Sequence, residues 1–335
     1  MKTGIFTITA CLATALILTS ARALENEYEY TVYRMEAPVV LDGRLDEDAW
    51  NYLPVATGFR ILGNPFIQPD KLAPKQTIFR MGWDAEFLYI GAKCMEPDIN
   101  DLESVKKDGA VSWKDNSVEI FMRPAPPDFD HQLIVKIFGT KNWRGETNKL
   151  WEAKTVVEKG AWTMEIKIPL SELGKMPAEN TTWPFNMARN IITAGNNQSD
   201  WRATDRYTTW APLKGRFHDF DHFGAITFSS KTLGREDVET INMELNQRLA
   251  RPLVANTRKI MTKCRRYMDE IKTDSPSAEL PMQDELEGRW SLLNAAASKN
   301  TLTLQEAQDA QQQAKELLAA ISKQYLTVMV AHESK

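Results

Sequence analysis

The pattern of apolar and polar positions changes once, near residue 230. From Tyr28 to about Ser229, apolar runs of five to eight residues alternate with polar positions and are separated by Pro, Gly, Asn and Asp clusters. This period of two, with turn residues between the runs, is typical of strands. No long helical pattern lies between the runs, so we expect a mainly β fold, an antiparallel β-sandwich. The expected strands are Tyr30–Tyr33, Thr77–Trp83, Phe87–Cys94, Ser117–Arg123, Gln132–Phe138, Leu150–Val157, Trp162–Ile168, Trp183–Ile191 and Phe223–Phe228.

After Ser230 the apolar residues recur at helical spacing, with Pro252 and Pro276 as the main interruptions. Three runs predict three helices, arranged as a small bundle or a long hairpin. The third run opens with a capping box, from Thr303 to Glu306. The apolar positions are Val238, Ile241, Leu245, Leu249, Ile260 and Met268, then Leu286, Trp290, Leu293 and Ala297, then Ala307, Ala310, Ala314, Leu317, Ile321 and Leu326.

The N-terminal residues have the pattern of a secretory signal. Lys2 supplies a positive charge, residues 5–18 are mostly apolar, and Ala21-Arg22-Ala23 is a small-x-small cleavage site. No later segment is apolar enough to predict a membrane span. The expected organisation is therefore a signal peptide at 1–23, a β-sandwich at 24–229 and a helical extension at 230–335, in a protein that is secreted or periplasmic.

Charge and cysteine content narrow the function classes. The formal net charge of −4 becomes more negative when Lys2 and Arg22 leave with the signal, which argues against nucleic acid as a general partner. The mature chain keeps Cys94 and Cys264. A bridge between them is one alternative, but Cys94 lies in an alternating apolar run, and we favour its packing as a small hydrophobic side chain.

The stretch from Arg248 to Arg266 has seven basic residues and no acidic one. It could address an anionic polymer or a membrane surface. We favour the alternative that it faces the acidic second helix, where Glu279, Asp284, Glu285 and Glu287 cluster.

The segment SWKDNSVEIF, from Ser112 to Phe121, carries the strongest chemical indication. Alternation along a strand would place Glu119 and Phe121 on one face, with Trp113 on the turn just before it. An indole can cover the apolar C–H face of a sugar ring while a carboxylate accepts hydrogen bonds from its hydroxyls. The alternative is that Trp113 belongs to the core and Glu119 to a solvated face.

Other candidate chemistry is weaker. The segment from His218 to His222 is metal-like, but we favour a role in shaping a loop ahead of the last strand. The Trp201–Trp210 segment, with Arg202, either rims a pocket or folds against itself. The sequence contains no nucleophile elbow, zincin helix, phosphate-binding glycine loop, Cys-x-x-Cys pair or haem-attachment motif.

Six ordered blocks give the β-region its resemblance to a known family. They are VVLDGRLDEDAW (39–50), FRMGWDAEFLYIGAKCMEPDI (79–99), SWKDNSVEIF (112–121), WTMEIKIPLSELG (162–174), WPFNMARN (183–190) and HFGAITF (222–228). Together they resemble the family 9 carbohydrate-binding modules and their secreted relatives, over roughly residues 36–228. The resemblance implies a β-sandwich, of the family 9 or DOMON-like kind, that holds a sugar between two aromatic rings.

The resemblance also implies roles for individual residues. Trp113 matches the first ring and Phe217 the second, where characterised modules have Trp, and Glu119 matches the acidic residue that binds hydroxyls. Ile134 occupies the place of a basic residue, and Lys136 lies one pleat further along the same face. The family's structural calcium has candidate oxygen ligands in Glu96, Asp98 and Asp115.

The preferred hypothesis is a secreted, non-catalytic protein that binds a mono- or oligosaccharide and serves polysaccharide catabolism. Trp113 and Phe217 would stack the ligand, Glu119, Lys136 and Arg202 would fix its hydroxyls, and Trp210 would lie at the rim. One alternative is a haem-binding electron-transfer subunit, with Met95, Met122 or Lys136 as iron ligands. Another is a glycoside-processing enzyme. The helical extension would dock on the sandwich, self-associate or bind a protein partner.

Overall fold

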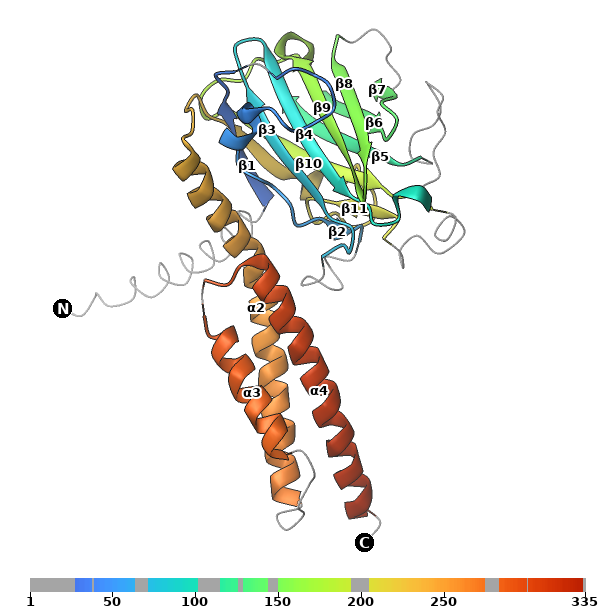
Figure 1. The fold of residues 1–335 in the computed structure, drawn as a ribbon, viewed down its shortest axis with the longest axis vertical. Coiled ribbons are helices and arrows are strands. Elements are labelled where there is room, and N and C mark those ends of the chain that lie inside the picture. The colour runs from blue at the N-terminus through green and yellow to red at the C-terminus, as the bar shows by residue number, and fades with distance from the viewer. Residues whose placement is uncertain are drawn as a thin grey trace, which may run out of the picture. The chain divides into compact units, whose positions relative to one another are not determined.

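A computed structural model describes residues 28–37, 39–63, 72–101, 115–125, 129–143, 150–193, 205–274, 283–299 and 301–333. The chain divides into two compact units, one ending at Ile241 and the other beginning at Asn242. The first is the β-domain and the second is the helical unit (Figure 1). The residues expected to form the signal, 1–23, lie outside the described ranges.

The described part of the β-domain has twelve strands. They are β1 (Glu29–Arg34), β2 (Arg60–Ile61), β3 (Thr77–Trp83), β4 (Phe87–Met95), β5 (Ser117–Ala125), β6 (Phe129–Lys136), β7 (Lys141–Trp143), β8 (Glu152–Glu158), β9 (Ala161–Pro169), β10 (Thr182–Asn190), β11 (Tyr207–Thr209) and β12 (Gly224–Phe228). All nine expected strands are present within a few residues of their expected ends. The three that were not expected, β2, β7 and β11, have two or three residues each, too few for an alternating pattern to be read.

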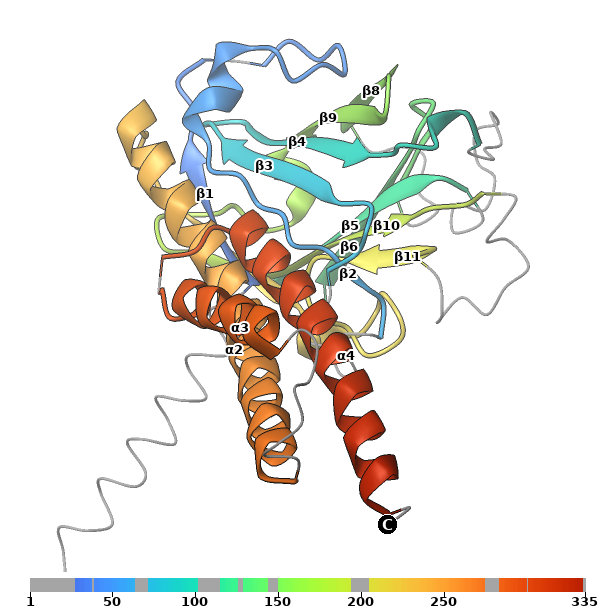
Figure 2. The same ribbon diagram turned by 60° about the horizontal axis from the view of Figure 1, so that its bottom comes forward.

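Hydrogen bonds join ten of these strands into one path, in the order β7-β6-β5-β10-β12-β1-β3-β4-β9-β8. All pairs are antiparallel except those of β1, which lies parallel to β12 through residues 29–32 and parallel to β3 through residues 33–34. The path is continuous because β1 changes neighbours midway. The β3–β4–β9–β8 half lies over the β5–β6–β10 half (Figure 2). The mainly β, mainly antiparallel fold is confirmed.

The β-domain core lies between the two halves. Alternate residues of the strands meet there, including Val118 and Ile120 from β5 and Ile90 and Ile166 from β4 and β9, all without exposed surface. Because side chains alternate along a strand, burial of one set leaves the other set of each strand on the opposite face. On β5 that opposite set holds the candidate binding residues.

The segment VVLDGRLDEDAW packs against β4, β8 and β9. Gly43 has φ +92°, and a Cβ there would lie 2.8 Å from the Thr155 backbone, so only glycine fits this turn. Trp50, in the short helix η2 (Asp48–Tyr52), is 1% exposed, and its indole Nε1 donates to the Glu165 carboxylate at 3.0 Å. The segment is therefore attached to β9 through Glu165.

The helical unit contains most of α2 (Arg235–Asp274), together with α3 (Gln283–Ala297) and α4 (Leu304–Glu333). Helix α2 continues through Pro252, although a proline inside a helix removes one hydrogen bond. The three helices share an apolar core that includes Cys264, Leu293 and Leu317. Three helices in a bundle were expected, but Leu326, expected on the apolar face, is 61% exposed, and Val328 is buried instead.

Both cysteines of the described chain are free and buried, Cys94 in the β-domain core and Cys264 in the helical core. The favoured packing role for Cys94 is confirmed. None of the described helices combines the length and the apolar character that a membrane crossing requires.

Candidate functional site

Strand β5 presents a polar and aromatic face between β6 and β10. Ser117, Glu119 and Phe121 point away from the core, since Val118, Ile120 and Met122 belong to it. The strand register places Gln132 of β6 beside Phe121, and Asn190 of β10 beside Ser117. These side chains form what we call the β5 face, which consists of Ser117, Glu119, Phe121, Gln132, Asn190 and the aromatic residues that cover Phe121. The expected pairing of Glu119 and Phe121 on one face is confirmed.

The Glu119 carboxylate is 3% exposed and is fixed by two side-chain amides. Gln132 Nε2 donates to one oxygen at 2.8 Å, and Asn190 Nδ2 donates to the other at 2.7 Å. Burial raises the pKa of Glu119 above its ordinary value, and the two amides partly oppose that rise. The carboxylate is thus held in one orientation in a buried site, where a low local dielectric strengthens an added hydrogen bond.

A histidine extends this network toward the surface. Gln132 uses its amide nitrogen on Glu119, so its carbonyl oxygen is the acceptor for His218 Nε2, 3.1 Å away. His218 therefore carries a proton on Nε2. It comes from the loop ahead of β12 and is exposed.

Aromatic side chains cover Phe121. Its ring meets those of Phe217, His218 and Phe223 edge-on, with centroids 6.3, 5.2 and 5.8 Å away. Phe217 also meets Tyr207 of β11 edge-on at 5.9 Å. Phe217 is half-buried, so two neighbours fix the ring while part of it remains accessible.

Two of the expected ligand-binding residues lie outside the described ranges. Trp113 belongs to residues 102–114 and Arg202 to residues 194–204, so the structure gives no account of either. The remaining four, Glu119, Phe217, Lys136 and Trp210, are described.

Trp210 is not at a rim, and that expectation is wrong. It is 3% exposed, and Tyr28, Phe79 and Phe185 surround its ring with centroids 5.4 to 5.8 Å away. A ring enclosed by three others in the core offers no face to a ligand.

Lys136 lies on the same side of the sheet as Glu119, as expected, but its ammonium is directed to a carboxylate. Its Nζ is 3.1 Å from Asp115, and both side chains are almost completely buried. A buried ion pair loses much stability when one partner is removed. The structure therefore gives Lys136 a clear role in holding the start of β5.

The three carboxylates expected to bind calcium are each neutralised by side-chain cations. Glu96, without exposed surface, lies 2.9 Å from Arg189 and 2.6 Å from Lys75, which also approaches Asp98 at 3.3 Å. Asp115 binds Lys136. Throughout the described residues, no group of three or more His, Cys, Asp and Glu side chains is arranged to hold a metal ion. The expected calcium set is wrong, because lysine and arginine supply the positive charge there.

The His218–His222 segment is not a metal site either. His222 Nδ1 lies 2.9 Å from Asp219, whose other oxygen accepts the Lys214 backbone N–H at 2.8 Å. His218 turns instead to Gln132. The favoured role, shaping the loop ahead of β12, is what these bonds provide.

The haem ligands considered above do not converge. Met122 is in the core, while Lys136 lies on the opposite side of the sheet. Met95, at the end of β4, is 39% exposed.

Sequence reasoning missed Gln132 and Asn190, the two residues that orient Glu119. Both lie in strands that were expected, but their meeting depends on the β5–β6 and β5–β10 registers. One signal was available: both are polar residues in strands otherwise rich in apolar ones.

The β-region has relatives among known families and structures. A family model described as "Carbohydrate family 9 binding domain-like" matches residues 41–231. A family 9 carbohydrate-binding module from Caldicellulosiruptor kristjanssonii, in complex with cellotriose, is 19% identical, with 61% of this chain and 95% of that chain covered and a TM-score of 0.47. A structure from the same organism in complex with glucose is 20% identical, with 60% and 97% covered and a TM-score of 0.46. No curated protein sequence matches the chain.

Proposed function

The chain belongs to the carbohydrate family 9 binding domain-like family, and from that premise we propose that it binds a mono- or oligosaccharide on the β5 face without catalysis. The observation that carries the proposal is the Glu119 carboxylate, buried and oriented by Gln132 and Asn190 beside an accessible aromatic ring. A fixed acceptor next to an apolar surface matches the two sides of a sugar, its hydroxyls and its C–H face.

Glu119 would accept hydrogen bonds from sugar hydroxyls. Each of its oxygens takes one amide hydrogen and retains a lone pair. Asn190 Oδ1 is buried and has no hydrogen-bond partner among the described residues. Because the Asn190 amide bonds Glu119, this oxygen would be a second acceptor for a hydroxyl that reaches Glu119. Neutral hydroxyls are donors that can satisfy both.

Phe217 would supply the apolar surface. Phe121 and Tyr207 contact its ring, which is half-buried, and the exposed part of the ring would stack on a pyranose. We propose Trp113 as the other ring, the first of the pair in the family resemblance, because SWKDNSVEIF puts it four residues before the start of β5 in sequence. Arg202 remains a proposed donor to the same ligand.

The proposal is of binding rather than hydrolysis. A glycosidase needs two carboxyl groups that both reach the scissile bond. Glu47 and Glu165 lie close together, since both accept the Trp50 indole N–H. Glu165 also accepts the backbone N–H groups of Asp42 and Gly43, so these donors commit its carboxylate to the fold. At Glu119 the neighbours are amides, which orient a carboxylate and transfer no proton.

We also propose that the protein acts outside the cytoplasm, in polysaccharide catabolism. The pattern of residues 1–23 supports this location. Saccharide sites of this kind bind with millimolar to micromolar dissociation constants, about −4 to −8 kcal/mol.

Removal of either ring tests the proposal. After a glycan array identifies a saccharide, isothermal titration of Phe217→Ala should give a Kd at least about fivefold higher, since an aromatic contact contributes about 1 kcal/mol or more. Trp113→Ala should abolish measurable binding.

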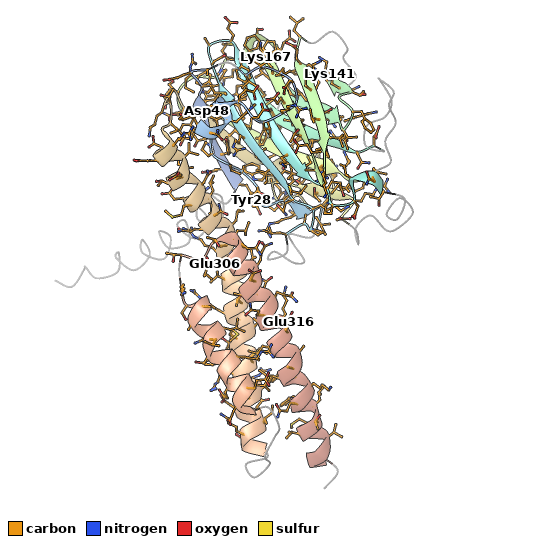
Figure 3. All side chains as sticks on the ribbon, viewed as in Figure 1. Tyr28, Asp48, Lys141, Lys167, Glu306 and Glu316 are labelled. Carbon is orange, nitrogen blue, oxygen red and sulfur yellow. The ribbon has the colours of Figure 1, made fainter. Side chains whose placement is uncertain are left out.

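Phe87→Ala is the matched control. Phe87 is also half-buried, but it lies at the start of β4 beneath Lys167, which Figure 3 labels, 4.0 Å from the ring centroid. This variant should bind as the unaltered protein does. Unchanged affinity in both Phe217→Ala and Trp113→Ala would refute the site.

A further inference from the structure

The cations of α2 divide into two groups in the helical unit. Arg265 and Lys272 lie 2.8 and 2.5 Å from Glu287 of α3, so part of the basic stretch faces the acidic helix as favoured. Arg251 and Lys259 are exposed, and the described residues include no ion-pair partner for either. The favoured alternative therefore accounts for only part of the stretch.

Arg251 is one of three cations that line a cleft of about 140 Å³ at one end of the bundle. Arg251 and Arg258 come from α2, and Lys299 comes from the connection that follows α3. None of the residues that line the cleft is acidic; they are Gln247, Ala250, Arg251, Val254, Ala255, Arg258, Lys299 and Leu302. The cleft has room for one anionic group, which the three cations that line it, Arg251, Arg258 and Lys299, would bind.

Packing holds the two walls of this cleft together. Leu302 joins Ala250 and Leu253 in a small apolar cluster that also contains Ala307. Arg258 Nε donates to the Ala297 carbonyl oxygen at 2.8 Å, which fixes its guanidinium near the end of α3. Thr303 and Glu306 then begin α4, where Figure 3 labels Glu306, whose carboxylate accepts the Thr303 backbone N–H at 2.8 Å. The cationic cleft is thus part of the folded bundle.

The positive charge extends from the cleft along one face of α2. At 100° per residue, Arg251, Arg258, Lys259 and Arg266 fall within an arc of about 100° and span about 22 Å of helix. Arg266 has one carboxylate nearby, Glu270 at 3.6 Å. A row of this length is suited to an extended polyanion rather than to one small ion.

We propose that this basic face, comprising Arg251, Arg258, Lys259, Arg266 and Lys299, binds an acidic polysaccharide, with one carboxylate in the cleft. A membrane is less suitable, because helices that bind lipid surfaces combine basic residues with exposed large apolar ones. The large apolar residues that line the cleft, Leu302 and Val254, instead pack in the apolar cluster with Ala250 and Leu253. Nucleic acid is less suitable because the chain is acidic overall. The aromatic ring beside Arg266, that of Tyr267, is already stacked on Tyr325. The proposal is independent of saccharide binding by the β5 face.

Binding of polygalacturonate to the full-length protein tests this site. In the triple variant Arg251→Gln, Lys259→Gln and Lys299→Gln, the Kd should rise at least about tenfold, because three positive charges that would attract the polyanion are removed. The affinity of the unaltered protein should fall steeply with added NaCl. Arg258 is left in place because it bonds the Ala297 carbonyl.

The matched control removes three charges from the other helices, in Arg289→Gln, Lys315→Gln and Lys323→Gln. It should keep the affinity of the unaltered protein, and circular dichroism should show both triple variants equally helical. Phe217→Ala should also retain polygalacturonate binding, which separates this site from the β5 face.

Four results would overturn the proposal. The first two are no binding of polygalacturonate, and an equal loss of affinity in both triple variants. The third is a loss of affinity in Phe217→Ala alone, and the fourth is tighter binding to anionic vesicles or duplex DNA than to polygalacturonate, abolished in the first triple variant. The first two remove the site, the third moves it to the β-domain, and the last changes its partner.

Discussion

Glu165 connects the chemistry of a single residue to the stability of the β-domain. Its carboxylate accepts the backbone N–H groups of Asp42 and Gly43 at 3.0 and 2.8 Å, and the Trp50 indole N–H at 3.0 Å. Burial, with a smaller contribution from Glu47, raises its pKa from 4.5 to about 7, against the effect of these donors. The folded protein therefore binds this proton more tightly than the unfolded chain does.

This shift predicts a pH dependence with a definite sign. The contribution of Glu165 is complete below pH 4.5 and is lost as the pH rises through about 7. Urea unfolding should show that the stability of Glu165→Gln relative to the unaltered protein increases by about 1 to 3 kcal/mol between pH 5 and pH 8. The exposed Glu152→Gln on β8 should show no such change. A pH-independent difference for Glu165→Gln would contradict the assignment.

At the site, sequence reasoning found the residues whose role is local. Glu119 and Phe121 share a face because a strand alternates, and that is legible within one segment. Gln132 and Asn190 meet Glu119 only through strand register. Trp210 lies in a segment of aromatic and charged residues that suggested the rim of a pocket, yet the core encloses its side chain.

The calcium prediction failed for a related reason. Glu96 and Asp98 are near each other in sequence, and a cluster of carboxylates is typical of a calcium site. Their partners, Lys75 and Arg189, come from other parts of the chain. Charge balance in a folded core is set by contacts that are distant in sequence.

At the level of elements, the sequence predicted the long strands and the three helices, because each carries its own period. It did not predict β2, β7 or β11, because these strands are too short to show an alternating period and form only by pairing with longer strands of the sheet. It also gave too much weight to Pro252, since tertiary packing of α2 outweighs the lost hydrogen bond.

The capping box of α4 is an element whose sequence prediction is confirmed and can be measured. The Glu306 backbone N–H lies 3.2 Å from Thr303 Oγ1, and the Glu306 carboxylate accepts the Thr303 backbone N–H. Thr303→Ala should lower the free energy of unfolding of the helical unit by about 1 kcal/mol in urea titrations followed at 222 nm.

Thr327→Ala is the control within the same helix, because the Thr327 hydroxyl only bonds the Lys323 carbonyl oxygen. It should be neutral or slightly stabilising, since alanine is the better helix former. Equal losses in the two variants would show that the cap makes no special contribution.

At the level of the whole molecule, the chain carries two candidate saccharide sites of different chemistry, one in each compact unit. The β5 face offers oriented acceptors and an aromatic ring, which suit neutral hydroxyls and C–H surfaces. The basic face of α2 offers cations, which suit carboxylates. Different salt dependence should distinguish them, because screening weakens only the second strongly.

The proposed function requires that saccharide hydroxyls bind the carboxylate that Gln132 and Asn190 orient. Side-chain amide signals in ¹H–¹⁵N spectra report on these two residues directly, since both amides donate to Glu119. Titration with an array-positive neutral saccharide should shift the Gln132 and Asn190 side-chain signals in step with the calorimetric binding curve. If the protein is saturated while both signals stay unmoved and only other residues shift, saccharide binding at Glu119 is refuted.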